Sequence, residues 1–234
     1  MKRTIFFDLD GTLLPMDQNA FLKAYLHLIG KTMAAYGYEP GKLVNVILSG
    51  TNKMINNDGD LTNEEVFWEE FTAVYGKAAR HDEPLFHKFY VEMFPKLQQY
   101  CGFNPLVPPL IKKLKALGYT LVLATNPVFP AVATHERIRW AGLEVSDFTY
   151  ITTYDNSHST KPNPRYFQEL LTKLGVKASD VLMVGNDTND DLAAAKVGIE
   201  LFFITDTLIN GNMIDLSRYP HGTFPDLATF LQIT

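Results

Sequence analysis

The sequence predicts an α/β protein built on a parallel β-sheet, with a helical segment inserted after the first strand. Residues 1–14 and 104–234 alternate short β-rich runs with amphipathic helical stretches, whereas residues 15–103 show helical patterns and no convincing strand. Alternation of strands and helices is typical of a parallel sheet covered by helices. We therefore expect a Rossmann-like sheet with helices on both faces and a helical insert of about ninety residues.

Five short apolar runs are the expected strands, at residues 4–7, 120–124, 149–152, 181–184 and 201–204. Helical stretches follow the same alternation at 110–117, 130–141, 164–174 and 190–197, and a glycine comes directly after each of them. Glycine is a common helix stop because it adopts the left-handed conformation without a steric penalty. We expect these strands to pair and these helices to cover them.

The insert has apolar side chains at helical spacing over residues 21–36, 43–55, 64–75 and 85–100. Thr62 and Glu65 match a capping box, which predicts a helix start at about residue 64. Aromatic side chains at helical spacing usually fill a core. We interpret seven aromatic residues of the insert as packing groups rather than ligand contacts: Phe67, Trp68, Phe71, Tyr75, Phe86, Phe89 and Tyr90.

The composition is that of an ordinary soluble globular protein, with 234 residues, 46% of them hydrophobic and 20% charged. The formal net charge of −5 argues against a nucleic-acid partner, although a small phosphorylated substrate remains compatible with it. Cys101 is the only cysteine, which excludes an internal disulfide and a cysteine-based metal cage. The apolar stretch 5–7 is too short for a signal-peptide core and no run is long enough to span a bilayer, so we expect a cytoplasmic protein without a membrane partner. The oligomeric state is not predictable.

The string TIFFDLDGTLL places two carboxylates at the end of the first strand. Asp8 and Asp10 are two residues apart, so their side chains face the same way at the edge where parallel sheets bind ligands. Neighbouring carboxylates repel unless a cation lies between them or one of them holds a proton, so the pair suits Mg²⁺ binding or acid–base and nucleophilic chemistry. Gly11 would let backbone amides approach a substrate, and Thr12 adds a hydroxyl. A solvated Asp-Gly turn is the alternative.

Two later strand ends carry groups that suit phosphate. Thr125 and Asn126 follow the second strand and can donate to phosphate oxygens, although a plain Thr-Asn-Pro turn explains them equally well. Lys161 lies in the STKPNP loop after the third strand. A lysine at that place would act as a point charge on a nucleophile and a bound phosphate.

The fourth strand ends in the acidic string GNDTNDD. Asp187 and Asp191 are four residues apart, with Asp190 between them, and such oxygen ligands suit Mg²⁺. For Asp190 and Asp191 a helix N-terminus is a strong alternative explanation, because its dipole favours negative charge. For Asp187, in the loop itself, the pattern favours the metal.

In this order the four strings resemble the haloacid-dehalogenase-like superfamily of hydrolases. FFDLDGTLL matches the DxDGT signature of that superfamily, and the Thr-Asn pair, KPNP and GNDTNDD are similar to its other three motifs. The helical insert is similar to the type 1 cap of phosphoglycolate-phosphatase-like members. The resemblance implies a Rossmann-like catalytic core at residues 1–14 and 104–234 and a helical cap domain at residues 15–103.

The resemblance also implies roles for the matching residues. Asp8 would be the nucleophile that forms an aspartyl-phosphate, and Asp10 would protonate the leaving group and then activate water. Thr125 and Lys161 would hold the phosphoryl group, with Asn126 beside them. Lys161 is therefore expected to be catalytic as well as substrate-binding.

The implied metal is Mg²⁺, held by Asp8, the backbone carbonyl of Asp10 and Asp187. Many members of the superfamily have Gly-Asp where this chain has Gly-Asn-Asp. Asn186 and Asp191 therefore stay open as alternatives to Asp187.

The resulting hypothesis is a Mg²⁺-dependent phosphatase for a small phosphorylated metabolite, with a cap that closes over the site and selects the substrate. The alternatives are a phosphomutase with the same core and a non-catalytic phosphate-binding regulatory module. A dehalogenase is disfavoured because it would not use Asp10, and no string marks the cap lysine that a phosphonate hydrolase needs. Several polar residues of the insert are candidate substrate contacts: Asp17, Gln18, Asn19, Lys23, His27, Lys53 and Arg80.

Overall fold

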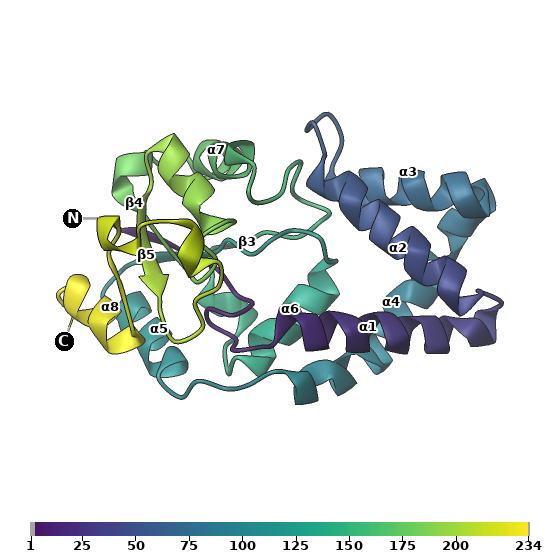
Figure 1. Cartoon of the computed structure of the whole chain (residues 1–234), viewed down its shortest axis with the longest axis horizontal. Coiled ribbons are helices and arrows are strands. Elements are labelled where there is room, and N and C mark those ends of the chain that lie inside the picture. Colours follow the sequence, from purple (N-terminus) through teal and green to yellow (C-terminus); the bar gives the residue numbers. More distant parts are fainter. Residues whose placement is uncertain (1–2, 234) are drawn as a thin grey trace.

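The computed structural model describes residues 3–233 and contains one six-stranded, fully parallel sheet in the order β3-β2-β1-β4-β5-β6. Its central strand β1 (Thr4–Phe7) pairs with β2 (Thr120–Leu123) on one side and with β4 (Val181–Gly185) on the other. The α/β prediction is thus confirmed. In Figure 1 the sheet and α5–α8 occupy the left part of the molecule, and α1–α4 extend to the right.

The outer strands differ in detail from the expectation. β5 (Glu200–Ile204) begins one residue earlier than predicted, and β3 is only Tyr150–Ile151. The sheet also contains β6 (His221–Gly222), which sequence reasoning missed. A strand of two residues, one of them glycine, has neither the length nor the β-branched or aromatic content that marks a strand in a sequence.

Helices cover both faces of the sheet, as predicted. Alternate strand residues point to opposite faces, so Ile5 and Phe7 belong to one apolar cluster and Phe6 to the other. The first cluster includes residues of α5 (Val107–Ala116), α6 (Ala131–Trp140) and α8 (Phe224–Phe230). The second includes residues of α7 (Pro164–Leu174) and of a 3₁₀ helix, Asp191–Val197. The stretch 190–197 is therefore helical but of the tighter 3₁₀ type.

The segment from the end of β1 to the start of α5 is helical throughout its regular structure. It contains α1 (Gln18–Met33), α2 (Pro40–Ile55), α3 (Asn63–Tyr75) and α4 (Glu83–Glu92), followed by the 3₁₀ helix Phe94–Tyr100. The expected capping box of Thr62 and Glu65 is present at the start of α3. The pattern at 85–100 breaks after α4 because Pro95 cannot donate the backbone hydrogen bond that an α-helix requires. We call this helical segment the cap.

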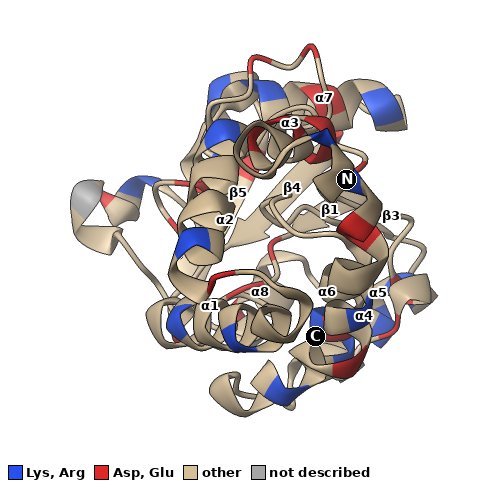
Figure 2. Cartoon of the chain, turned by 90° about the vertical axis from the view of Figure 1, so that its right-hand side faces the viewer, with Lys and Arg blue, Asp and Glu red and all other residues tan. Residues whose placement is uncertain are grey.

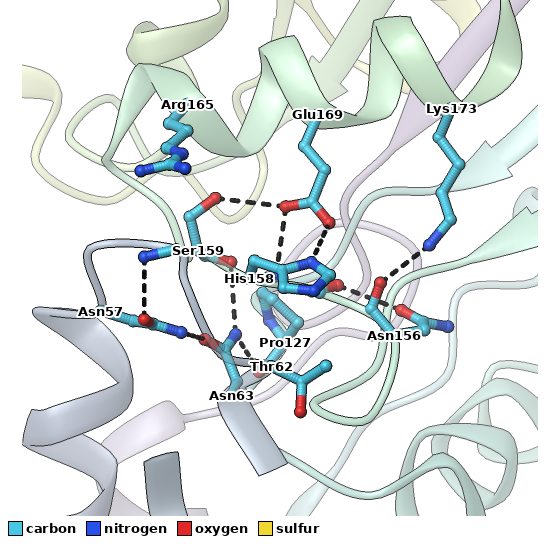
Figure 3. A network of polar contacts seen from close by, with 12 residues as sticks. Asn57, Thr62, Asn63, Pro127, Asn156, His158, Ser159, Arg165, Glu169 and Lys173 are labelled. Atoms are coloured by element: carbon cyan, nitrogen blue, oxygen red, sulfur yellow. Dashed lines mark hydrogen bonds and ion pairs between the residues drawn. The ribbon is translucent and has the colours of Figure 1, made fainter. Parts of the chain in front are cut away.

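A buried asparagine joins the cap to the sheet domain (Figure 3). Asn63, at the first position of α3, is fully buried, and its side-chain amide donates to the carbonyls of Pro127 (3.1 Å) and Ser159 (3.3 Å). Its Oδ1 accepts a hydrogen bond from Asn57 (2.9 Å), and its backbone N–H donates to the carbonyl of Ser157 (2.8 Å). The N-terminus of α3 is thus fixed on the loop that leads to Lys161.

The surface of the cap end carries charges of both signs. In Figure 2, which looks onto this end, Lys and Arg and Asp and Glu are spread over several elements. Within residues 3–233, every helix falls short of the length and apolar character that a bilayer-spanning helix needs.

Candidate active site

The predicted strand ends meet at one cavity of about 200 Å³ at the carboxyl edge of the sheet, which we call the catalytic cavity. Asp8 and Asp10 follow β1, Thr125 and Asn126 follow β2, and the acidic loop follows β4, so parallel pairing alone brings them to the same edge. The cavity is lined by polar and apolar side chains from the sheet domain and from α1: Asp8, Asp10, Met16, Gln18, Phe21, Leu22, Thr125, Asn126, Phe129, Arg137, Asp187, Asp190 and Asp191.

The carboxylate of Asp8 is nearly buried and held from two sides. Lys161 Nζ lies 2.8 Å from its Oδ1, and the hydroxyl of Thr12 donates to its Oδ2 at 3.2 Å. The backbone N–H of Asp8 donates to the carbonyl of Val184 at 2.9 Å, so the residue continues the pairing of β1 with β4. Its position is therefore fixed by the sheet and its charge is compensated by Lys161.

Lys161 is buried and bridges two carboxylates, because its Nζ also lies 2.7 Å from Oδ1 of Asp191. Burial alone would lower the pKa of the Lys161 amine, but the negative charges of Asp191 and Asp8 outweigh it and raise that pKa well above its ordinary value. Burial raises the pKa of Asp191, and Lys161 opposes this rise. Lys161 is accordingly a permanent cation at the centre of the site.

Asp10 has an environment different from that of Asp8. Its Oδ2 forms an ion pair with Nη1 of Arg137, whereas its Oδ1 is buried and has no hydrogen-bond partner among the described residues. Burial raises the pKa of the Asp10 carboxyl above its ordinary value; Arg137 opposes this rise and the charge of Asp8 adds to it. A carboxyl group with a raised pKa and an unpaired oxygen is suited to hold and release a proton.

Arg137 is a site residue that sequence reasoning missed. It lies on α6 and is only 1% exposed; its guanidinium also reaches the hydroxyl of Thr134 (3.3 Å) and stacks 4.6 Å from the ring centre of Phe129. Its helical spacing is the sequence feature that could have identified it. Arg137 is four residues after Ala133 and one before Ile138, so it lies on the buried face of α6. An arginine on an apolar helix face requires an acidic partner, and Asp10 provides it.

The acidic loop after β4 contributes three carboxylates to the catalytic cavity and keeps Asn186 outside it. Asp187, Asp190 and Asp191 line the catalytic cavity, whereas Asn186 is buried beside it, accepting from the Thr12 hydroxyl (2.9 Å) and donating to the carbonyl of Thr207 (2.8 Å). The side chain of Asp187 accepts hydrogen bonds through Oδ1 from the backbone N–H of Asn189 (2.8 Å) and from the amide of Asn210 (2.8 Å).

The remaining predicted substrate contacts fall into two pairs. Thr125 and Asn126 line the catalytic cavity, and the buried Oδ1 of Asn126 has no hydrogen-bond partner in the part of the chain that the structure describes. Gly11 and Thr12 lie beside Asp8 but do not line the cavity, and their backbone N–H groups donate to the carbonyls of Leu14 (2.8 Å) and Leu9 (3.1 Å). This geometry favours a role for Gly11 and Thr12 in shaping the loop rather than in contacting substrate.

Gly11 has a backbone reason to be glycine. Its φ is +89°, and a Cβ at this position would lie 2.4 Å from Nδ2 of Asn186. A larger residue would therefore strain the turn and displace the acidic loop from Asp8.

The donor set fits a divalent cation. The described residues place five carboxylates at the cavity against two cationic side chains, Lys161 and Arg137, so the cavity is negative when all are ionised. The carboxylates are those of Asp8, Asp10, Asp187, Asp190 and Asp191. Within residues 3–233, no three His, Cys, Asp or Glu side chains are gathered closely enough to hold a metal by themselves. Mg²⁺ does not need such a cage, because it typically uses one or two carboxylates and completes its shell with water and substrate oxygens.

Comparison with known proteins assigns the chain to a family. A family model of haloacid dehalogenase-like hydrolases matches residues 2–198 of the chain. The chain belongs to this family. Phosphatases of the family generally use a divalent metal, in agreement with the excess of negative charge in the catalytic cavity.

Similar proteins are phosphatases. The phosphoglycolate phosphatase of Vibrio parahaemolyticus is 27% identical over 236 residues, covering 99% of this chain and 95% of that relative. That of Neisseria gonorrhoeae is 30% identical over 205 residues, covering 84% of this chain and 77% of that relative. A crystal structure of a HAD phosphatase from Thermococcus onnurineus superposes with a TM-score of 0.59 at 21% identity, covering 99% of this chain and 98% of that one. The protein is therefore an enzyme, a phosphatase-type hydrolase of this family.

Proposed function

We propose that this protein is a cytoplasmic, Mg²⁺-dependent phosphatase that hydrolyses a small phosphorylated metabolite through an aspartyl-phosphate on Asp8. The observation that carries the proposal is the contrast between two neighbouring carboxyl groups. Asp8 is paired with the buried cation Lys161, whereas Asp10 has a raised pKa and an oxygen without a partner. Two carboxyl groups in such different environments suit a nucleophile and an acid–base catalyst.

In the first step the Asp8 carboxylate attacks phosphorus, and the bond between phosphorus and the alcohol oxygen breaks. Asp10 gives its proton to the departing oxygen, so that a neutral alcohol leaves. Arg137 holds Asp10 in position by its ion pair, and the stacking of Arg137 on Phe129 fixes the guanidinium in turn. Positioning of this kind supplies a large part of the acceleration in phosphoryl transfer.

In the second step water cleaves the aspartyl-phosphate. Asp10 is now a carboxylate and takes a proton from the water while the water oxygen attacks phosphorus. The bond between phosphorus and the Asp8 oxygen breaks, which restores the Asp8 carboxylate and releases phosphate. The charge of Arg137 stabilises the ionised form of Asp10 that this step needs. Asp10 thus alternates between acid and base within one turnover.

The groups that would hold the phosphoryl oxygens are Lys161, Thr125 and Asn126. Lys161 lies beside Asp8 as a fixed cation, and Thr125 and Asn126 line the catalytic cavity. The side-chain N–H of Asn126 donates to Oδ2 of Asp190 (3.2 Å) and would have to leave that carboxylate to donate to a phosphate oxygen. Asp8, the backbone carbonyl of Asp10 and Asp187 would hold Mg²⁺, with Asn186 and Asp191 as alternatives to Asp187. The metal would offset the repulsion between the phosphate and the carboxylates.

Phosphate release from a generic aryl phosphate tests the proposal. We expect Mg²⁺-dependent turnover that chelation abolishes and that Asp8→Asn lowers by at least about a thousandfold. Asp60→Asn, at an exposed position of the cap, is the matched control and should keep wild-type activity. Equal rates for Asp8→Asn and wild type would refute the assignment of Asp8. A phosphomutase would instead retain the phosphoryl group and transfer it to a second position of a sugar phosphate.

A further inference from the structure

A second cavity, of about 390 Å³, lies under the cap and adjoins the catalytic cavity; we call it the cap cavity. Gln18, Leu22 and Phe129 line both cavities, so the two spaces meet along the first turns of α1 and the segment after β2. The other walls come from α2, α3 and α4 and from Tyr154 of the sheet domain. A molecule whose phosphate reaches Asp8 can therefore extend directly into the cap cavity.

The wall of the cap cavity is apolar and aromatic. Ile47, Leu48 and Ile55 of α2 line it together with Phe67 and Trp68 of α3. Within the described residues, no Lys, Arg, His, Asp or Glu lines this space. A carboxylate or second phosphate on the substrate would lose its hydration there without gaining a counter-ion, which is costly. An uncharged apolar group would instead be stabilised by burial.

The few polar groups of the wall are neutral. The hydroxyls of Tyr25 and Tyr90 bond to each other at 2.8 Å, and burial raises the pKa of Tyr25 to about 12, so both stay uncharged. The indole N–H of Trp68 lies beside the hydroxyl of Tyr154, and burial raises the pKa of this tyrosine, so that group is neutral as well.

The aromatic wall is held in place by the cap's attachment to the sheet domain. Asn63 precedes Phe67 and Trp68 by about one turn of α3, and its hydrogen bonds to Pro127 and Ser159 fix that turn against the core (Figure 3). Gly50 of α2 lets the ring of Phe67 pack directly against α2, since a Cβ at Gly50 would lie 2.6 Å from the ring. The cap cavity is thus a formed space with positioned walls.

We propose that the cap cavity binds the leaving alcohol of the substrate, and that this alcohol is uncharged and has an aromatic or branched aliphatic body. The inference rests on the proposed phosphatase function and names its substrate class. This substrate class differs from the phosphoglycolate named for relatives of the chain, because that two-carbon ester carries a charged carboxylate and has no apolar body to fill the cap cavity.

Kinetics with three phosphate esters test the proposal in the full-length enzyme. With Mg²⁺, KM for 1-naphthyl phosphate should be about a hundredfold lower than KM for methyl phosphate and for phosphoglycolate, since the apolar cavity adds binding of the naphthyl group. KM is the quantity compared because naphthol is a better leaving group than an alkyl alcohol and raises kcat by itself. A preference for phosphoglycolate, or equal values for all three, would overturn the substrate class and leave the phosphatase function intact. Hydrolysis of none of the three would count against the phosphatase function instead.

A second experiment introduces a negative charge into the cap cavity by substitution. Leu48 lines the cavity and is 43% exposed, so Leu48→Glu can be tolerated by the fold; Val74→Glu, on α3 and 41% exposed outside the cavity, is the matched control. Leu48→Glu should raise KM for 1-naphthyl phosphate by about tenfold and leave methyl phosphate unchanged. Val74→Glu should change neither. Equal effects of the two substitutions would contradict the proposal.

A binding measurement separates the inference from turnover. The chain has two tryptophans, and only Trp68 lines the cap cavity. Titration of Asp8→Asn with 1-naphthyl phosphate should quench tryptophan fluorescence, and Trp140→Phe in the same background should keep this quenching. Absence of quenching at saturating naphthyl phosphate, or its loss with Trp140→Phe, would refute binding in the cap cavity even if the enzyme is an active phosphatase.

Discussion

The catalytic cavity and the cap cavity adjoin each other and are opposites in composition. Five carboxylates and an arginine line the first, of about 200 Å³, and Lys161 forms ion pairs with two of those carboxylates. The second is nearly twice as large, and among the described residues no acidic or basic side chain lines it. Charges that face one another suit phosphoryl transfer, in which electrostatic stabilisation dominates. An apolar wall suits the recognition of a leaving group. The chain thus separates chemistry from selection between its sheet domain and its cap.

This contrast makes a general prediction: changes in the catalytic cavity should affect all substrates alike, whereas changes in the cap cavity should affect only substrates with a large alcohol. Substitutions of Lys161, Arg137 and Asn63 test this prediction.

Lys161→Met should lower activity on every phosphate ester by about a thousandfold, because it removes the cation beside Asp8. It should also lower the free energy of unfolding by about 3 kcal/mol, since Asp8 and Asp191 then share a buried site without a counter-charge. Urea denaturation and steady-state kinetics measure the two effects. Lys112→Met, at an exposed position of α5, is the control and should change little. A large loss of activity on one ester and no loss on another would contradict the prediction that the catalytic cavity acts on all substrates alike.

Arg137→Gln should lower kcat by about ten- to a hundredfold, with a change in the pH profile that a merely structural role would not produce. Arg137 lowers the pKa of Asp10, so its removal raises that pKa further. The alkaline limb of kcat/KM, where Asp10 loses the proton needed by the leaving group, should move to higher pH. A profile that moves to lower pH, or stays in place while kcat falls, would contradict the role of Arg137 in positioning and tuning Asp10.

Asn63→Ala should reduce the free energy of unfolding by about 1 to 3 kcal/mol, because it leaves the carbonyls of Pro127 and Ser159 without their buried partner. The same substitution should raise KM for 1-naphthyl phosphate more than for methyl phosphate, since it loosens the wall that carries Phe67 and Trp68. Asn45→Ala, exposed on α2, should stay within about 0.5 kcal/mol of wild type. An equal rise in KM for both esters would place Asn63 outside substrate selection.

The catalytic cavity was largely predictable because its groups follow directly after strands. An apolar run that ends in Asp8 fixes both the strand and the place of the carboxylate, and the parallel pairing of β1 with β2 and β4 then brings Thr125 and the acidic loop to the same edge. Arg137 escaped this reasoning because it lies within a helix, where only its place on the buried face distinguishes it from a surface arginine.

The cap cavity was not predictable, because helical spacing shows which side chains turn inward and not how completely they fill the space between helices. Phe71 and Phe89 are buried packing groups, as expected. Phe67, Trp68, Phe86 and Tyr90 also belong to the first apolar cluster or pack against it, as expected, and they line the cavity as well, which helical spacing did not predict. Of the polar cap residues proposed as substrate contacts, Gln18 alone lines either of the two cavities in the described part of the chain.

The central claim is that the phosphoryl group passes through the carboxylate of Asp8. Rapid acid quench of the enzyme during turnover of an aryl phosphate, followed by peptide mass spectrometry, tests it directly. We predict a phosphoryl adduct on the peptide that contains Asp8, and a larger amount of it in Asp10→Asn, in which the water that completes the reaction has no base. Turnover without any adduct on that peptide, or an adduct at another residue, would contradict the account.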